Sequence, residues 1–247
     1  MQVEYNSNLS PAWSDAWLDP SDDKKFGPNN RYFKFNPTEA RKLLAAAGYP
    51  NGVEFDFFYN REDTYGAVYS RQMEIYTAMF LDIGLKAKLQ PQSYAVFIPQ
   101  YHVAYIPANF AATGGFNGLV LVAERSRYTP VLCLYGMIHA NGDSFHGATS
   151  TGSDAQKGDP RVNSELDRLR YEADKEKVKA GLADMQRYLA EQAYLIPKPS
   201  NSIPYTVWWP VLGNQGAFTS TPVGSNRWVE HNLPWWIDES KPPIGKA

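Results

Sequence analysis

The stretch VEFDFFYNREDTYGAVYSRQMEIYTAMFLDIGLKAKLQ, residues 53–90, decides the fold of this chain. In residues 53–59, large apolar side chains alternate with acids, which is the two-residue period of a half-buried strand. Residues 65–83 place apolar side chains at three- and four-residue steps, as on one face of a helix. Gly84 then follows as a left-handed helix cap, and residues 85–89 alternate again. The stretch therefore predicts one strand–helix–strand unit and an α/β fold.

Further helices are marked by their first residues. Asn36-Pro37 and Asp159-Pro160 each combine a capping side chain with a proline that suits the first helical position. Gly48 ends the first of these helices, and Asp174 caps another one. We therefore expect helices on both sides of the strand–helix–strand unit.

The remaining segments give weaker patterns. The apolar run at residues 118–123 predicts a strand covered on both faces. Three prolines break residues 91–117 into short helical or loop pieces, and five glycines make residues 124–160 mostly loop. The predicted architecture is a twisted mixed sheet flanked by helices.

Composition excludes several classes of function. The formal net charge is −2, from 24 basic and 26 acidic residues, so the balance predicts no nucleic-acid surface. The single cysteine, Cys133, excludes an internal disulfide and a multi-cysteine metal site. The residues after Met1 have neither a basic nor an apolar region of the kind that opens a secretory signal, so we expect no signal peptide in this chain.

Residues that could carry chemistry are few. His139, Asp143 and His146 lie within eight residues but in a glycine-rich loop without regular ligand spacing, so we predict no metal site and no cofactor. Apolar neighbours make Cys133 a buried, inert thiol. No catalytic motif is present, and we predict a protein that is not an enzyme. A hydrolase whose residues converge around His139 or His146 remains an alternative, because catalytic triads assemble from distant positions.

A binding segment is predicted after the strand at 118–123. Ligands of open α/β sheets gather beyond the carboxyl ends of the strands. Glu124, Arg125, Arg127 and Tyr128 occupy that position. An arginine can clamp a carboxylate, Glu124 can accept an ammonium group, and Tyr128 can stack on a ligand. The alternative is a surface turn with a Glu–Arg ion pair.

Several segments together resemble one protein family. Residues 36–49 are similar to the Asp-Pro-x-x-Ala-x-x-Leu-Leu-x-x-Ala-Gly-Tyr helix of family 5 extracellular solute-binding proteins, with Asn36 in place of the usual Asp. Residues 80–87 resemble the family's helix-to-strand turn, and residues 159–197 resemble its closing helices and the segment after them. The resemblance is to the C-terminal half, or second lobe, of these substrate-capturing components of oligopeptide, dipeptide and nickel ABC transporters. Residues 124–130 depart from the family's Trp- and Asp-Pro-containing loop, so ligand contacts do not transfer by residue identity.

The resemblance implies an incomplete two-lobed fold of the type II periplasmic-binding-protein kind. Residues 1–30 would be an irregular lead-in, residues 31–204 the second-lobe domain, and residues 205–247 a Trp- and Pro-rich return segment toward the first lobe.

The implied function is capture of a small organic solute, a peptide, by lobe closure for an ABC importer. The implied protein is a monomer that meets a membrane permease through the full-length receptor and binds no nucleic acid. It would be periplasmic or extracellular and anchored at the cell surface, with signal and anchor outside this chain. A protein-interaction module that uses the Trp-rich C-terminal segment remains a second alternative.

Overall fold

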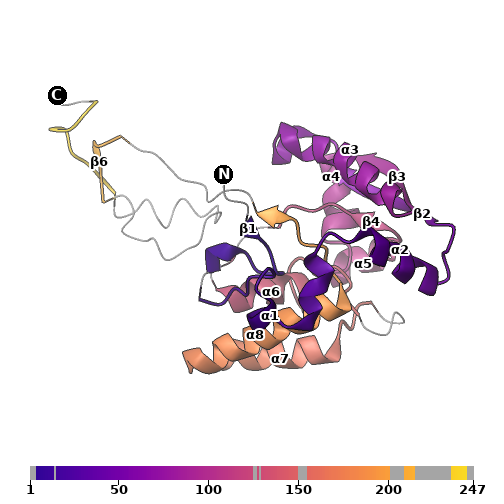
Figure 1. The fold of residues 1–247 in the computed structure, drawn as a ribbon. Helices are drawn as coiled ribbons and strands as arrows, with labels where there is room; N and C mark the ends of the chain where they lie inside the picture. Colours follow the sequence, from indigo (N-terminus) through magenta and orange to yellow (C-terminus); the bar gives the residue numbers. More distant parts are fainter. Residues whose placement is uncertain are drawn as a thin grey trace. The chain divides into compact units, whose positions relative to one another are not determined.

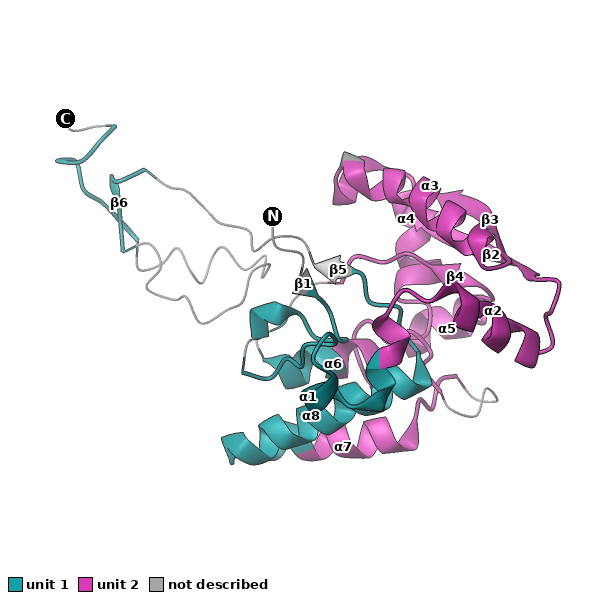
Figure 2. Cartoon of the chain, in the orientation of Figure 1, with its two compact units in different colours: residues 1–30, 125–134, 169–247 teal, residues 31–124, 135–168 magenta. Residues whose placement is uncertain are grey.

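The computed structural model describes residues 4–13, 15–124, 127, 129–149, 155–200, 209–214 and 235–243 (Figure 1). The chain divides into two compact units (Figure 2). Unit 1 consists of residues 1–30, 125–134 and 169–247, and unit 2 of residues 31–124 and 135–168. These units do not test the predicted segments at residues 1–30, 31–204 and 205–247, which stay a prediction. None of the described helices has the length and apolar character needed to cross a membrane.

The predicted strand–helix–strand unit forms the centre of unit 2. Strand β2 (Val53–Asn60) is followed by α3 (Ala67–Asp82) and β3 (Leu85–Gln92), and the sheet is completed by β4 (Leu119–Val120). The strand order is β3-β2-β4, with both pairs parallel. The α/β class is thus confirmed. Antiparallel pairing occurs only outside this sheet in the described part of the chain, in two short ladders of unit 1.

Helix α3 covers one face of the sheet. The buried cluster between them contains Phe57, Tyr69, Met73 and Leu121. Because side chains of a strand alternate between faces, the neighbouring Phe58 points to the other side, where its ring stacks on Tyr101 at 4.2 Å between centroids. The hydroxyl of Tyr69 donates to the carbonyl of Leu121, which ties α3 to the chain beyond β4.

The amino ends of β2 and β3 meet at a close backbone contact. The amide of Val53 donates to the carbonyl of Gly84 at 3.0 Å. A Cβ on Gly52 would lie 2.2 Å from that carbonyl oxygen, and Gly52 has a φ of +84°. Gly84 has a φ of +92°, in agreement with its predicted role as a left-handed cap after α3.

Short helical elements surround the sheet in unit 2. Helix α2 (Pro37–Ala46) starts as predicted, with the Asn36 side chain accepting a hydrogen bond from the amide of Glu39. The elements expected between residues 91 and 117 are present as short pieces. They are α4 (Tyr94–Phe97), η4 (Ile98–His102) and α5 (Pro107–Thr113), and η3 (Asp63–Tyr65) precedes α3.

One helix that the sequence did not predict lies within the segment 124–160, which was expected to be mostly loop. Helix α6 spans Pro130–Ile138, and the Thr129 hydroxyl accepts a hydrogen bond from the Leu132 amide at its start. The helix is apolar on all sides, so it lacks the periodic pattern that marks an amphipathic helix. Cys133 lies in α6 and is a buried free thiol.

Two longer helices follow along the chain, the first mainly in unit 2 and the second in unit 1. Helix α7 (Pro160–Tyr171) and helix α8 (Lys175–Gln192) begin at Asp159 and Asp174, as predicted. The described part of the lead-in contains short elements, namely β1 (Glu4–Tyr5), η1 (Pro11–Trp13), α1 (Asp23–Phe26) and the start of η2 (Pro28–Phe33). In the two antiparallel ladders, β1 pairs with β5 (Pro199–Ser200), and β6 (Leu212–Gly213) pairs with β7 (Trp236–Ile237).

A buried glutamine joins the lead-in of unit 1 to α8. The Gln186 side chain accepts hydrogen bonds from the Ser7 hydroxyl and the Leu18 amide, and it donates to the carbonyl of Ala16. These bonds satisfy both ends of a fully buried amide.

Candidate functional site

A cluster of polar side chains lies beyond the carboxyl end of β4 in unit 2. The Nε2 atoms of His102 and His146 donate to Oε1 of Glu124 at 3.1 Å and 2.9 Å. The Ser144 hydroxyl donates to Oε2 at 3.0 Å. Both oxygens of the carboxylate therefore have partners within the protein. We call Glu124, His102, His146 and Ser144 the Glu124 cluster.

Other elements hold the members of the Glu124 cluster in place. The Tyr65 hydroxyl, from η3, lies 3.3 Å from Nδ1 of His102. The two imidazole rings stack with centroids 6.0 Å apart. The amide of Ser144 donates to the carbonyl of Gly136 in α6 at 3.0 Å. The cluster thus collects groups that lie far apart in the sequence.

The environment of Glu124 keeps its carboxylate charged. Burial disfavours the charged form and by itself would raise the pKa of Glu124. The hydrogen bonds and charges of His146 and His102 together outweigh this effect and lower the pKa below its ordinary value. The cluster therefore contains an ionised carboxylate at neutral and mildly acidic pH.

The four residues of the predicted binding segment have different outcomes. Glu124 lies in the cluster. The backbone amide of Arg127 donates to Sγ of Cys133 at 3.3 Å within unit 1. Arg125 and Tyr128 lie outside the described residues. The ligand contacts assigned to all four residues stay a prediction.

Sequence reasoning did not find His102 and Ser144. They lie 22 and 20 residues from Glu124, and no spacing between them follows the period of a helix or a strand. His146 drew attention only as a member of a loop cluster with His139 and Asp143. The one usable signal was the position of Glu124 at the end of a predicted strand.

The two histidines of the hydrolase alternative have separate partners. His146, which is hydrogen-bonded to Glu124, has no nucleophile as a partner in the described part of the chain. The ring of His139 stacks on Tyr135 at 4.0 Å. Its Nδ1 accepts from the Asn141 amide at 2.9 Å, and its Nε2 lies 3.3 Å from a carboxylate oxygen of Asp167. Among the described residues, no group of three or more histidine, cysteine or acidic side chains is arranged to hold a metal ion.

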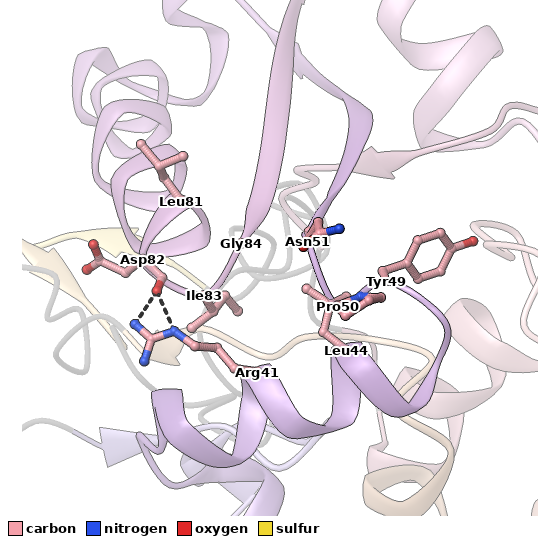
Figure 3. Close-up of a pocket in the computed structure, with 10 residues that line it drawn as sticks. Arg41, Leu44, Tyr49, Pro50, Asn51, Leu81, Asp82, Ile83 and Gly84 are labelled. Atoms are coloured by element: carbon pink, nitrogen blue, oxygen red, sulfur yellow. Dashed lines mark hydrogen bonds between the residues drawn. The ribbon is translucent and has the colours of Figure 1, made fainter.

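A pocket of about 340 Å³ lies at the other end of the sheet (Figure 3). It is lined by α2, by the turn at residues 49–52 and by the end of α3. Arg41 donates from Nε and Nη2 to the carbonyl of Asp82 at 3.1 Å and 2.5 Å, which caps the C-terminus of α3 (Figure 3). Because β2 and β3 begin beside this pocket, it lies at the amino ends of the strands, away from the Glu124 cluster. The hydrogen bonds of Arg41 beside this pocket anchor α2 to α3.

Comparison with known proteins finds one family whose model matches part of the chain. The model described as "Bacterial extracellular solute-binding proteins, family 5 Middle" matches residues 3–117, which include α2 and the strand–helix–strand unit. The resemblance to family 5 solute-binding proteins is confirmed. No curated protein matches the chain.

Several solved structures of binding proteins share the fold of this chain. AgaA from A. tumefacien R10, in complex with agropinic acid, gives a TM-score of 0.58 at 18% identity and covers 80% of this chain. A periplasmic oligopeptide-binding protein from Thermotoga maritima, with bound mannohexaose, gives 0.56 at 19% identity and covers 81%. The clavulanic acid biosynthesis oligopeptide binding protein 2 gives 0.52 at 19% identity and covers 76%.

The chain spans about a third of the length of these solved proteins, namely 35%, 36% and 31% in the same order. The fold is therefore part of a type II periplasmic binding protein. At these identities the likeness concerns the fold, and the solutes named for the three proteins differ.

Proposed function

We propose that this chain acts in the substrate-binding component of an ABC importer and captures a small organic solute. The observation that carries the proposal is the family 5 match over residues 3–117, which includes the strand–helix–strand unit of the fold. In this role the protein binds and releases its solute without chemical change. The protein would act outside the cytoplasm, anchored at the cell surface, and deliver the solute to a membrane permease.

We propose a peptide as the solute. Two of the three structures described above are named as oligopeptide-binding proteins, and the third binds agropinic acid. The proposed contacts are Glu124, Arg125, Arg127 and Tyr128, which follow β4 at the carboxyl ends of the strands. Arginine suits a peptide carboxylate because its guanidinium forms two parallel hydrogen bonds.

The proposed mechanism is closure of two lobes over the peptide. A ligand that contacts both lobes stabilises the closed state by its higher affinity for that state. Since this chain spans about a third of the related structures, we expect it alone to supply only part of the contacts. Its own affinity for a peptide should then be weak, with a Kd of about 1 mM, or about 4 kcal/mol of binding free energy.

The test is a titration of the chain with Ala-Ala-Ala, followed by NMR and by calorimetry. We expect saturable changes in the amide signals of residues 119–124 with a millimolar Kd. Replacing Arg127 by Ala should weaken binding about fivefold or more, the loss of a charge-assisted hydrogen bond. Arg168→Ala is the matched control, because Arg168 pairs with Glu165 on the surface of α7.

Two results would count against the proposal. Absence of any change at about 10 mM peptide, roughly ten times the expected Kd, would exclude peptide capture by this chain. Micromolar affinity would contradict the part of the proposal that requires a second lobe.

A further inference from the structure

We propose that the outer edge of β3 binds an extended peptide segment in which acidic and apolar residues alternate. This edge consists of the backbone groups of residues 85–90 that point away from β2. It belongs to unit 2 alone, and its role as an interaction surface is independent of solute capture. Free backbone groups, a pair of lysines and the residue pattern of β2 support the proposal.

The backbone of β3 leaves hydrogen-bonding groups free on one side. Among the described strands, β2 is the only neighbour of β3. At the two ends of this parallel pair, the carbonyls of Gly84 and Gln92 accept 3.0 Å hydrogen bonds from the β2 side. Because backbone groups alternate in direction along a strand, those of Leu85, Ala87 and Leu89 point outward. They have no backbone partner among the described residues.

Pro91 gives an independent check on these directions. A proline has no N–H, so in a sheet it takes a position whose N–H side faces away from the neighbouring strand. Pro91 lies two residues after Leu89 and shares its outward direction. The edge that can donate hydrogen bonds therefore ends before Pro91. Residues 85–90 give it a length of about 20 Å, enough for a strand of five residues.

Two lysines lie on one face of this edge. Lys86 and Lys88 are exposed and stand opposite Glu54 and Asp56 of β2 in the register. Nζ of Lys88 lies 2.7 Å from a carboxylate oxygen of Glu54, whereas Lys86 forms no ion pair with a described residue. In an antiparallel addition, both lysines take the non-hydrogen-bonded positions, where facing side chains come closest. An acidic residue opposite Lys86 therefore meets an unpaired cation.

The other face of the edge is apolar. Ala87 packs against the buried cluster that contains Phe57 and Met73, so the outward-pointing residues have their side chains on the α3 face. Leu89, on the same face, is 38% exposed. Apolar residues of an added strand would cover Leu89 while its acidic residues face the lysines. Strand β2 already has this alternation of acidic and apolar residues on the inner side of β3.

The same lysines disfavour a second copy of this chain as the occupant. Every antiparallel register that pairs Ala87 with Leu85, Ala87 or Leu89 of another copy also places a lysine opposite a lysine. Like charges at facing positions destabilise a strand pair, and lysine and proline protect the edges of natural sheets in this way. The edge therefore selects a partner of opposite charge.

The experiment titrates the full chain with the peptide Ac-VEVEV-NH2, with Ac-VKVKV-NH2 as the charge-reversed control. For the acidic peptide we expect saturable shifts in the amide signals of Leu85, Ala87 and Leu89, with a Kd of about 1 mM and about fivefold weaker binding of the basic peptide. Hydrogen exchange is the second readout. These three amides should gain protection when the peptide binds, whereas those of Lys86 and Lys88, which face β2, should be protected in both states.

Methylation of the peptide backbone tests the strand pairing without altering the protein. A methyl group on the nitrogen of the central valine removes the N–H that pairs with Ala87, whereas on a glutamate it removes an N–H that points to solvent. We expect the first change to weaken binding about tenfold and the second to leave it within about twofold. Equal binding of the two methylated peptides would overturn the strand pairing.

Reversal of one charge tests the lysine face. Lys86→Glu should remove the preference for the acidic peptide, because a like charge then faces its glutamates. Lys42→Glu is the matched control, since Lys42 lies on α2 beside Glu39 and away from β3. An unchanged preference in Lys86→Glu would show that charge does not select the partner.

Two further outcomes would overturn the proposal. The first is an absence of shifts at residues 85–89 at about 10 mM acidic peptide, roughly ten times the expected Kd, even where the signals of residues 119–124 change. Changes at residues 119–124 alone would instead agree with the proposed solute capture. The second is protection of the edge amides that rises with protein concentration in the absence of peptide, which would show that a second copy occupies the edge.

Discussion

At the scale of single residues, the charge of Glu124 links stability to pH. The folded state lowers the pKa of this carboxyl group from an ordinary value of 4.5. Because the folded pKa lies below the unfolded one, the resulting stabilisation is fully present above about pH 4.5. It is lost as the pH falls toward the folded pKa, by at most about 1.4 kcal/mol for each pH unit.

We therefore expect Glu124→Gln to lower the free energy of unfolding at pH 7 by about 2 kcal/mol, the effect of weakening hydrogen bonds to a buried charge. The difference from the original chain should narrow between pH 4.5 and pH 3.5. Urea unfolding at several pH values measures it. Glu54→Gln is the control, because the ion pair of Glu54 with Lys88 is exposed and should be worth less than about 1 kcal/mol. An equal difference at pH 7 and pH 3.5 would contradict the linkage.

A second residue-scale prediction concerns glycines with positive φ. Gly52→Ala should destabilise the chain by about 3 kcal/mol, because the new Cβ adds a backbone clash to an unfavourable φ. Gly66 has a similar φ of +92° but nothing within 4 Å of a Cβ. Gly66→Ala should therefore cost only about 1 kcal/mol. Equal losses in the two variants, measured by urea unfolding, would show that the close approach to Gly84 is not limiting.

At the scale of elements, three helices begin with the same local chemistry. Asn36-Pro37, Thr129-Pro130 and Asp159-Pro160 each place a capping side chain before a proline. The first and third helix starts were predicted because an amphipathic pattern of residues follows each of them. The second was missed because α6 is apolar on all sides and contains Gly136. A capping residue followed by proline thus marked the start of α6, whereas the hydrophobic pattern of the helix did not.

Strand β4 shows the limit of local patterns. The apolar run predicts a strand at residues 118–123, but only Leu119 and Val120 pair with β2. Apolar character reports burial, whereas pairing depends on which residues of another strand lie alongside. The same reason hides His102 and Ser144 from prediction, because their contacts with Glu124 depend on tertiary structure. The position of Glu124 at the carboxyl edge of the sheet could be predicted from the sequence. The hydrogen-bond donors His102 and Ser144 could not.

The cap of α2 gives a prediction at this scale. Helix α2 has no buried residue, so its stability depends on local interactions more than that of α8, which buries six. Asn36→Ala should cost about 1 kcal/mol and raise amide hydrogen exchange across α2. Asn36→Ser keeps a capping oxygen and should restore protection. If exchange in α2 is unchanged in Asn36→Ala, the cap does not hold the helix.

At the scale of the whole molecule, the two units share helices. The chain passes between them after residues 30, 124, 134 and 168. Helices α6 (Pro130–Ile138) and α7 (Pro160–Tyr171) each contain one of these points, so each belongs partly to both units. Because helix formation is cooperative along the chain, unfolding one unit should destabilise the helical turns that lie in the other. We therefore expect the units to unfold together.

The distribution of tryptophan makes this expectation testable. All seven tryptophans lie in the sequence of unit 1, so their fluorescence reports on that unit alone. Gly52→Ala lies in unit 2, yet it should shift the urea midpoint seen by tryptophan fluorescence as much as the midpoint seen by circular dichroism. Asp174→Ala, which removes the cap of α8 in unit 1, should likewise shift both. A tryptophan midpoint that stays unchanged in Gly52→Ala would show that the shared helices do not couple the two units, and that each unit unfolds on its own.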